Sequence, residues 1–428
     1  MPPTRNLLMS SLFSLRGNAR ACVYTEPMWG LSMMLVIPYA SVFMLALGLP
    51  DEQIGLLATV STLSQVAFSL VSGAVTDKLG RRVVTAWADV LAWSIPCLVW
   101  AVAHDFWAFL LASVVNGAFQ LASNAWDCLL IEDLERSLIT RVYSLIKVAG
   151  EFSALFAPIA AVLVARFGLV PAVRILYVNA FVIFTAKIVI LYRTTTETRV
   201  GRLRQEQTRG VRVWTLLAEY RDVMGLFIRS KGTVLSLVIT AIVGAVMLVN
   251  STFWQVVINQ RLGVPDPLLP FFPMVRSILS VVFFFGVIPR LTHAVDLKRP
   301  TLWGFLSYLG GQALLVLVPA TTTAGLDTYV LLGVCLVLDA FGAGILSMLS
   351  WSLFALHVHQ AERSRVMALQ RTAVLLLTAP FGWISGWLSG IDRTWPFLLT
   401  SALLVLGIAV TARWWVTTHT ESVTAAAT

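Results

Sequence analysis

Charged side chains stand in the middle of several long apolar segments, where a charge is costly unless it meets a partner or water. Glu151 follows Lys147 by four residues, so the two share one face of a helix. Arg276 and Asp339 lie near the middle of two later segments. Intramembrane ionisable groups mark solute and proton pathways. We take Glu151, which has no evident neighbour in the first half of the chain, as the first candidate for a protonatable or solute-contacting group.

A line of polar residues follows one face of another apolar segment. Its members are spaced three or four residues apart: Ser113, Asn116, Gln120, Asn124 and Asp127. At 1.5 Å per residue the line is about 21 Å long, which suits the wall of a water-filled cavity. The alternative is hydrogen bonding between helices, worth about 0.6 kcal/mol for each group. A pair between Asp127 and Lys147, which lie at a similar depth, would also be structural.

Three further polar side chains lie close together in one segment: Asn250, Trp254 and Gln255. They could supply amide and aromatic contacts to a solute. Lys187, five residues from the end of its segment, is expected to extend its ammonium group to the membrane surface. The four cysteines are far apart, and no spacing of Cys and His predicts a metal site or a disulfide framework.

The composition identifies the solvent of this chain. Of 428 residues, 58% are hydrophobic and 12% are charged, and the mean hydropathy is +0.81. Soluble domains carry about 25% charged residues. About 20 apolar residues cross the hydrocarbon core as a helix. The sequence therefore predicts an all-α membrane protein with twelve transmembrane helices, at 27–48, 53–76, 83–103, 106–131, 141–166, 170–192, 233–258, 267–289, 300–319, 327–355, 365–389 and 394–415.

Lys and Arg residues are concentrated in alternate loops. Of the 31, we place 23 on the side of the N-terminus, four within the segments, and four on the opposite side, namely Arg166, Arg174, Arg261 and Arg393. The positive-inside rule then makes both termini cytoplasmic, in the cell membrane. The predicted organisation is an N-terminus (1–26), a six-helix bundle (27–192), a loop (193–232), a second six-helix bundle (233–415) and a cytoplasmic tail (416–428). Within the loop, 213–228 has one apolar face, which predicts an amphipathic helix on the membrane surface.

The two halves contain a short repeat. Residues 141–147 and 365–371 share the pattern R-V-x-x-L-x-[K/R] at the start of the fifth and eleventh predicted helices. Each copy then reaches an Ala-Pro pair, at 157–158 and 379–380. Both copies begin on the cytoplasmic side, so the sequence predicts two pseudo-symmetric bundles related by an axis along the membrane normal.

Between the second and third predicted helices the chain reads G-A-V-T-D-K-L-G-R-R, over residues 73–82. This resembles the G-x-[LV]-x-D-[RK]-x-G-R-[RK] signature of the major facilitator superfamily, at the loop where that family carries it. The resemblance extends to the twelve helices, their six-plus-six division and the long central loop. In physical terms, Gly73 permits close helix contact and Gly80 permits a tight turn. Asp77 suits a neighbouring helix N-terminus, whose partial positive charge favours a carboxylate.

The resemblance implies a conformational latch on the cytoplasmic side, which holds the two halves together in the outward-facing state and releases on switching. Its residues would be Gly73, Asp77, Gly80, Arg81, Arg82, Glu132, Asp133 and Arg141. The two adjacent arginines are expected to pair with the two adjacent acids. The second half has Arg290 where the motif would have its acid, so the latch is expected to be asymmetric. By the same comparison Asp89 lies on a peripheral helix and is expected to be structural.

The family architecture also places the fifth and eighth helices across a central cavity. Arg276 could then reach Glu151 or Asp339. Arg371 is the repeat counterpart of Lys147, and two cations facing each other there would favour an anionic or polyhydroxyl solute. Alternatively, each cation binds backbone carbonyl groups or reaches the interface.

These features predict a secondary active transporter of a small organic solute, working by alternating access and coupled to protons, with efflux slightly favoured. Uptake or exchange of a sugar or organic anion is the alternative, and a non-transporting sensor is a third. The pattern of drug/proton antiporters is incomplete, because Ser113 stands where they carry Arg, four residues before Gly117. No nucleotide-binding P-loop is present, so an ATP-driven pump is not expected. An enzyme is not expected either. We expect no cofactor, metal or nucleic-acid partner, and a monomer whose partners are the solute, protons and the lipid bilayer.

Overall fold

The computed structural model describes residues 15–210, 231–287, 297–357 and 363–427. Within these ranges the chain is helical and contains no strand. Twelve helical segments are long and apolar enough to cross a membrane, six ending by Thr194 and six beginning from Val234. The predicted all-α fold class is confirmed. The predicted amphipathic helix at 213–228 and Arg290 lie outside the described residues.

The observed segments differ from the predicted ones mainly at their ends. They are Gly17–Ala46, Asp51–Leu79, Arg81–Val102, Phe106–Ile131, Leu138–Phe167, Leu169–Thr194, Val234–Gln260, Asp266–Gly286, Lys298–Leu317, Leu326–Leu349, Leu369–Ile391 and Trp395–Arg413. The first begins ten residues before the predicted start at residue 27. This correction places Glu26, which the sequence had assigned to the N-terminal tail, inside a helix.

The chain forms two compact units. Unit 1 comprises Met1–Tyr39 and Leu63–Ala218, and unit 2 comprises Ala40–Thr62 and Glu219–Thr428. Most of each predicted half therefore falls in one unit. Residues 40–62, which end the first segment and begin the second, belong with the C-terminal helices.

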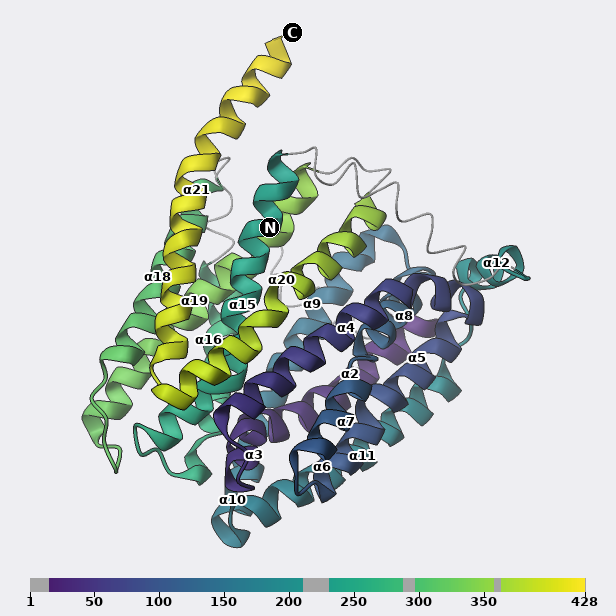
Figure 1. The fold of residues 1–428 in the computed structure, drawn as a ribbon. Helices are drawn as coiled ribbons and strands as arrows, with labels where there is room; N and C mark the ends of the chain where they lie inside the picture. The colour runs from purple at the N-terminus through teal and green to yellow at the C-terminus, as the bar shows by residue number, and fades with distance from the viewer. Residues whose placement is uncertain (1–14, 211–230, 288–296, 358–362, 428) are drawn as a thin grey trace. The chain divides into compact units, whose positions relative to one another are not determined.

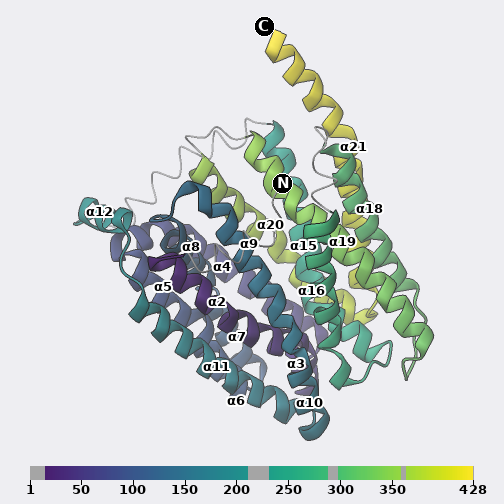
Figure 2. The ribbon, with the colours of Figure 1, turned by 180° about the vertical axis from the view of Figure 1, so that it is seen from behind.

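Unit 1 contains a set of helices packed around α2 and α11 (Figures 1 and 2). They are α2 (Gly17–Val36), η1 (Ile37–Tyr39), the second part of α4 (Asp51–Leu79), α5 (Arg81–Asp89), η2 (Val90–Ser94), α6 (Ile95–Val102), α7 (Phe106–Asn116), α8 (Phe119–Ile131), α9 (Arg136–Ser153), η3 (Ala154–Phe156), α10 (Ala157–Phe167), α11 (Leu169–Thr194) and α12 (Arg199–Gln207). A buried cluster that includes Cys22, Leu129, Val142 and Leu191 joins α2 to α8, α9 and α11. This packing fixes the polar side chains described below, because close-packed interiors leave little freedom.

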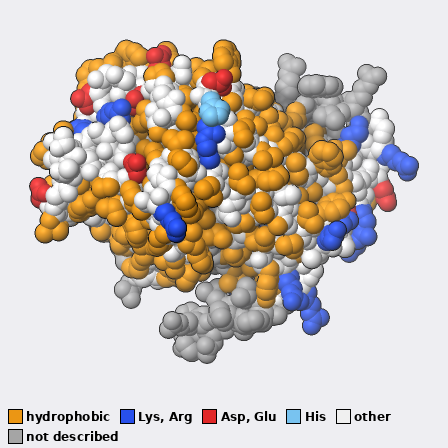
Figure 3. Space-filling model, turned by 90° about the horizontal axis from the view of Figure 1, so that it is seen from below, with side chains coloured by type: hydrophobic (Ala, Val, Ile, Leu, Met, Phe, Trp, Pro, Cys, Tyr) orange, Lys and Arg blue, Asp and Glu red, His pale blue; other side chains and the backbone are white. Residues whose placement is uncertain are grey.

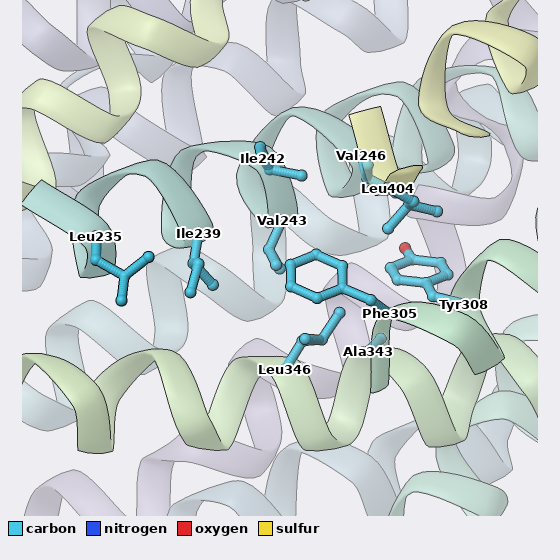
Figure 4. Close-up of a cluster of buried hydrophobic side chains, with 10 residues drawn as sticks. All are labelled: Leu235, Ile239, Ile242, Val243, Val246, Phe305, Tyr308, Ala343, Leu346 and Leu404. Carbon is cyan, nitrogen blue, oxygen red and sulfur yellow. The ribbon is translucent and has the colours of Figure 1, made fainter. Parts of the chain in front are cut away.

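Unit 2 contains the remaining helices. They are α3 (Ala40–Ala46), the first part of α4, α15 (Lys231–Gln260), η4 (Asp266–Leu268), α16 (Phe271–Val282), η5 (Phe283–Val287), α18 (Lys298–Leu317), α19 (Leu326–His357), α20 (Arg363–Ile391) and α21 (Trp395–Ala427). Figure 4 shows the core between α15, α18, α19 and α21, where the rings of Phe305 and Tyr308 lie among aliphatic side chains such as Val243, Leu346 and Leu404. α21 continues to Ala427, past the predicted end of its segment at 415.

The first part of α4 packs against α20 without intervening side chains. A Cβ added at Gly386 would lie 2.8 Å from the Cα of Gly55 and 2.7 Å from the carbonyl oxygen of Asp51. One turn along, the Thr59 hydroxyl donates to the Ala379 carbonyl at 2.7 Å and accepts from the Trp383 amide at 2.7 Å. In an unbroken helix that amide would bond directly to that carbonyl. The Thr59 hydroxyl thus inserts into the backbone ladder of α20.

The repeated Ala-Pro pair has a different outcome in each half. In unit 1 the fifth segment changes to a tighter turn at Ala154–Phe156, and α10 restarts with Pro158 in its first turn, where proline is tolerated. In unit 2, α20 continues through Pro380. There the neighbouring Thr59 hydroxyl bridges the opened ladder beside the proline.

Large apolar side chains cover much of the outer surface. Figure 3 shows one face on which hydrophobic side chains occupy most of the described area. Trp87, Trp107, Leu111 and Leu317 are each at least 60% exposed. Such a surface is expected where lipid, not water, is the solvent.

Candidate functional site

Three charged side chains of the predicted latch form one cluster in unit 1, which we call the Arg81 cluster: Asp77, Arg81 and Glu132. The guanidinium of Arg81 is 2.9 Å from an Asp77 oxygen and 3.1 Å from both oxygens of Glu132. Arg81 is only 4% exposed. The pair between Arg81 and Glu132 is the one expected from the sequence. It joins the start of α5 to the residue after α8.

Arg82 has a different partner from the one expected. Its guanidinium donates to the Tyr192 carbonyl at 2.7 and 3.0 Å and lies 4.1 Å from the centre of the Tyr192 ring. Of the two acids expected to pair with the arginines, Asp133 accepts from the Arg199 amide at 3.2 Å. Because α11 ends beside α5, a long side chain leaving Arg82 meets that helix end before it can reach α8. The expectation that Arg82, like Arg81, pairs with one of the acids Glu132 and Asp133 is therefore wrong.

The helix N-terminus next to the motif is capped by a glutamate that was not among the predicted residues. Glu197 accepts from the amides of Arg81 and Arg82 at 3.0 and 3.1 Å. Asp77, for which a helix N-terminus was expected, accepts from the side chain of Arg81 instead. Gly80 has φ of 90°, in the region that favours glycine, and a Cβ there would meet Glu197 and Gln205. The predicted tight turn thus also leaves space for Glu197 and Gln205. Both belong to the segment that follows α11, which we call the linker.

The linker helix α12 is joined to the same place by several hydrogen bonds. The Thr198 hydroxyl caps α12 by accepting from the Gly201 amide at 2.8 Å, and it donates to Glu132. The side chain of Gln205 donates to the Leu79 carbonyl at 2.9 Å. These contacts connect the linker to the Arg81 cluster. The remaining predicted latch residues, Gly73 and Arg141, lie in α4 and on the exposed side of α9.

A buried ion pair joins α5 to α11. The ammonium of Lys187 lies 3.1 Å from a carboxylate oxygen of Asp89, with both side chains at most 7% exposed. The prediction that Lys187 reaches the membrane surface is wrong, because this acid is close enough to hold it inside. Asp89 has the structural role expected of it. Glu26 of α2, missed because it was placed outside the first segment, interacts electrostatically with Lys187, Asp89 and Asp127.

Removing one member of this pair should be costly. We expect Lys187→Met to lower the free energy of unfolding by about 3–5 kcal/mol, since it leaves the Asp89 carboxylate buried without its cation. The double variant Lys187→Met/Asp89→Leu should recover most of that loss. The measurement is thermal denaturation of the purified protein in detergent, followed by tryptophan fluorescence. A double variant no more stable than the single one would contradict the assignment.

The polar line of the fourth segment is interrupted. The amides of Gly117 and Ala118 donate to carbonyls three residues back, so the segment turns between α7 and α8. Ser64 packs against Gly117 and donates to the Val114 carbonyl at 2.6 Å. A straight helix would carry a continuous polar line of about 21 Å. That prediction is wrong, because the helix turns at Gly117 and Ala118. Sequence periodicity assumes an unbroken helix and cannot reveal the turn.

Two members of that line hydrogen bond to neighbouring helices. Asn116 donates to the Ala92 carbonyl at 2.7 Å, and Gln120 donates to Gln65 at 3.1 Å. Tyr143 of α9 donates to Asp127 at 3.4 Å. These contacts correspond to the alternative interpretation, bonding between helices. Asn124 is half-buried in α8.

Glu151 has a neighbour in its own half, contrary to expectation. It lies 3.6 Å from the ammonium of Lys147, one turn earlier on α9. Lys147 is 46% exposed and Glu151 21% exposed, so the pair is accessible. A pair at this spacing and exposure adds only a few tenths of a kcal/mol to stability. Contact with a solute would therefore disrupt it at little cost.

Five buried polar residues and the half-buried Arg276 lie together in unit 2, and we call them the Asp339 cluster: Asn250, Arg276, Tyr308, Gln312, Asp339 and Thr400. The Gln312 amide donates to both oxygens of Asp339 at 3.2 Å and to Asn250 at 3.3 Å. Thr400 donates to Gln312 at 3.0 Å. Asp339 is only 4% exposed, and Gln312 is completely buried. The cluster thus ties α15, α18, α19 and α21 together around one carboxylate.

Arg276 connects α16 to this cluster. It hydrogen bonds to the Tyr308 hydroxyl and interacts electrostatically with Asp339. The structure thus brings Arg276 and Asp339, two of the residues chosen from the sequence, close together. A Cβ on Gly311 would collide with the Asp339 carboxylate, so this glycine makes the space for it. Tyr308, Gln312 and Thr400 were missed, although Gln312 is an amide within an apolar segment and could have been noticed on that ground.

The other predicted residues of unit 2 lie outside this cluster. Trp254 packs edge-on against Phe272, with ring centres 5.4 Å apart. The Trp254 indole nitrogen and the Gln255 carbonyl oxygen are buried without a hydrogen-bond partner among the described residues. Arg371 is half-buried in α20. In the described part of the chain no group of three or more Cys, His, Asp or Glu residues could hold a metal ion.

Solved structures share this arrangement of helices. The nucleoside transporter NupG is 15% identical, with a TM-score of 0.70 over 94% of this chain and 99% of that one. The peptide transporter POT in complex with sulfate is 15% identical, with a TM-score of 0.67 over 95% and 97%. The human organic anion transporter MFSD10 (TETRAN) is 16% identical, with a TM-score of 0.60 over 96% and 100%. At these identities the likeness concerns the fold alone.

A sequence relative matches a shorter stretch. Quinolone resistance protein NorA of Staphylococcus aureus is 34% identical over 87 residues, which is 20% of this chain. The match spans only 22% of that protein's length. The model of the Major Facilitator Superfamily, by contrast, matches residues 28–382. With its twelve membrane-spanning helices, the chain belongs to the Major Facilitator Superfamily of transporters.

Proposed function

We propose that this transporter is a proton-coupled exporter of small amphipathic organic compounds that works by alternating access. The observation that carries the proposal is the Asp339 cluster. Its carboxylate is buried inside a membrane-spanning helix and is connected to helices throughout unit 2. A charged acid inside the membrane is costly and needs a specific partner, so it is retained where it has a function. In transporters such acids form proton pathways.

Protonation of Asp339 would change the bonding of the whole cluster. The ionised carboxylate attracts Arg276 and accepts two hydrogen bonds from Gln312. A proton removes that charge and leaves the guanidinium of Arg276 without its counter-ion. The guanidinium is then free to move with α16 away from the solute, so proton uptake favours solute release, as export in exchange for protons requires. Proton binding at Asp339 and solute binding near Arg276 are coupled in this way, since each changes the free energy of the other.

Alternating access requires contacts that form at one end of the molecule while the other end is open. In the proposed orientation, with both termini cytoplasmic, the packing of Gly55 and Thr59 on α20 lies toward the outside. The Arg81 cluster lies toward the cytoplasm. Solute release to the outside would require the first part of α4 to separate from α20. The proposed role of the Arg81 cluster is to position the loop that forms the opposite contact.

The direction of transport rests on the named relative. NorA is a quinolone resistance protein, and the shared stretch favours export of amphipathic compounds by this chain as well. Uptake of an organic anion is the second candidate, because Arg276 supplies a cation beside the Asp339 cluster. Other side chains proposed to contact the solute are Asn116, Gln120, Asn124, Asp127, Lys147, Glu151, Asn250, Trp254, Gln255 and Arg371.

The decisive experiment uses purified protein in liposomes with an imposed pH gradient and a fluorescent quinolone as the probe. We expect wild type to move the quinolone against its gradient. Asp339→Asn should reduce this proton-driven flux about tenfold or more, since it removes the titrating group. The variant should retain exchange of quinolone across the membrane at equal pH, because solute binding does not need the proton.

A matched control comes from the same helix. Asp327 lies at the exposed start of α19, and Asp327→Asn should leave proton-driven flux unchanged. Glu151→Gln tests the candidate that the sequence favoured. If Asp339→Asn keeps its proton-driven flux while Glu151→Gln loses it, the coupling site is on α9. Quinolone movement in the opposite direction would replace export by uptake.

A further inference from the structure

A hollow of about 540 Å³ lies at one end of unit 2. It is lined by the start of α4, the end of α15, the turn between α18 and α19 and the turn between α20 and α21. All of these segments belong to unit 2. Pockets for small organic ligands have volumes of roughly 300–1,000 Å³. In the proposed orientation the hollow is on the outer side of the membrane.

One arginine of this hollow is incompletely paired. Arg393 lies 3.5 Å from a carboxylate oxygen of Asp51, longer than the roughly 2.7–2.9 Å of a good charge-assisted hydrogen bond. Its other terminal nitrogen, Nη1, is buried and has no hydrogen-bond partner within the described ranges. The side chain is still 29% exposed. Arg393 therefore keeps donor capacity beyond what Asp51 uses.

The neighbouring charges do not compete for that capacity. Arg261 donates to the carbonyls of Val318 and Val316 at 2.9 and 3.5 Å. Asp392 accepts from the hydroxyl and the amide of Thr394, both at 2.7 Å, and these bonds hold the pKa of Asp392 below its usual range. Its carboxylate is thus already supplied with donors at neutral pH.

Asp51 is bound in a way that allows it to release Arg393. Its other oxygen accepts from the Ser389 hydroxyl at 2.7 Å, so Asp51 keeps one strong hydrogen bond after the exchange. A free carboxylate can accept two parallel hydrogen bonds from a guanidinium. Asp51 reaches only one terminal nitrogen of Arg393, and the other is buried. Once released from Asp51, the guanidinium can turn so that both nitrogens donate to such a ligand.

We propose that this hollow binds the carboxylate of a small organic anion, which replaces Asp51 on the guanidinium of Arg393 and loosens the packing of α4 on α20. Asp51 begins α4, and Gly55, one turn further, is in contact with Gly386. A ligand that displaces Asp51 therefore acts on the helix that separates when this end opens. The site goes beyond the proposed function, because it does not depend on Asp339 or on proton coupling.

The test is equilibrium binding to the full chain in lipid nanodiscs, measured by calorimetry without a pH gradient. The probes are benzoate and its uncharged counterpart benzamide. We expect benzoate to bind about tenfold tighter than benzamide, and Arg393→Gln to abolish this difference. Asp51→Asn should bind benzoate several-fold more tightly than wild type, because the competing carboxylate is gone. This gain cannot arise from misfolding.

Two controls decide where benzoate binds. Arg166 is an exposed arginine of unit 1 on the same proposed side, and Arg166→Gln should leave benzoate binding unchanged. Asp339→Asn should also leave it unchanged. Equal binding of benzoate and benzamide, weaker benzoate binding by Asp51→Asn, or a benzoate affinity that depends on Asp339 would each overturn the proposal. An affinity that depends on Asp339 would instead place benzoate at the Asp339 cluster, whereas the other two results would leave the proposed proton-driven flux untouched.

Discussion

Gly386→Leu is expected to reduce transport several-fold, because the new side chain has no space between α4 and α20. The Cβ alone would lie 2.8 Å from the Cα of Gly55 and 2.7 Å from the Asp51 carbonyl oxygen. Both neighbours are backbone and cannot rotate away. Overpacking at such a site costs about 1–3 kcal/mol or more. That cost falls only on the conformation in which the helices touch, so its population should drop roughly tenfold.

The contact can be measured without knowing the solute. With Cys22, Cys97, Cys128 and Cys335 replaced by serine, a Cys pair at Asp51 and Ser389 should be cross-linked by a short bifunctional thiol reagent, since the native side chains are in hydrogen-bond contact at 2.7 Å. We expect Gly386→Leu to reduce this cross-linking several-fold. Quinolone flux should fall in parallel.

Gly390→Leu is the matched control. Gly390 lies one turn further along α20, and a Cβ there would meet nothing within 4 Å. The helix propensity of the two substitutions is the same, so only the clash differs. Normal cross-linking and flux in Gly386→Leu would show that the helices do not rely on this contact.

The fold could be predicted from the sequence because its cause is local. Each membrane-spanning segment is apolar over about 20 residues, and that property is read along the chain. The start of the first segment was misplaced because Glu26 and the arginines before it interrupt the hydropathy. In the structure Glu26 is tolerated inside the segment because Lys187 lies within electrostatic range. That compensation comes from α11 and is invisible in the local sequence.

The side-chain pairs were harder to predict because periodicity gives the face of a helix but not the neighbour that the face meets. The pair of Arg81 and Glu132 could be predicted because Arg81 belongs to a family motif whose position between the second and third helices is known. Lys187 and Asp89 are 98 positions apart, and no motif connects them. Glu197 is 116 positions from Arg81 and lies in a linker that hydropathy treats as solvent-exposed. Such pairs form only when distant helices pack together. That packing depends on the whole sequence and not on any short stretch of it.

Arg81→Met is expected to destabilise unit 1 strongly, although it removes a single charge at the start of α5. Arg81 is 4% exposed and is the cation shared by Asp77 and Glu132. Breaking a buried pair costs about 3–5 kcal/mol, since it leaves the partner acid unpaired. Asp77 is 33% exposed, so most of this cost should come from Glu132, at 14% exposed. A fall in the melting temperature in detergent would measure it.

A comparison with the adjacent Arg82 separates the effect of losing a buried ion pair from the effect of losing a positive charge. Arg82 binds one backbone carbonyl at the molecular surface, and Arg82→Met should cost about 1 kcal/mol or less although it removes the same charge. The linker gives a second readout, because the α12 cap Thr198 is hydrogen bonded to Glu132. Trypsin should therefore cleave after Arg199 and Arg202 of α12 faster in Arg81→Met than in Arg82→Met. Equal cleavage with unequal melting temperatures would mean that α12 is held by Glu197 and Gln205 alone, and that the Arg81 cluster stabilises α4, α5 and α8 without controlling the linker.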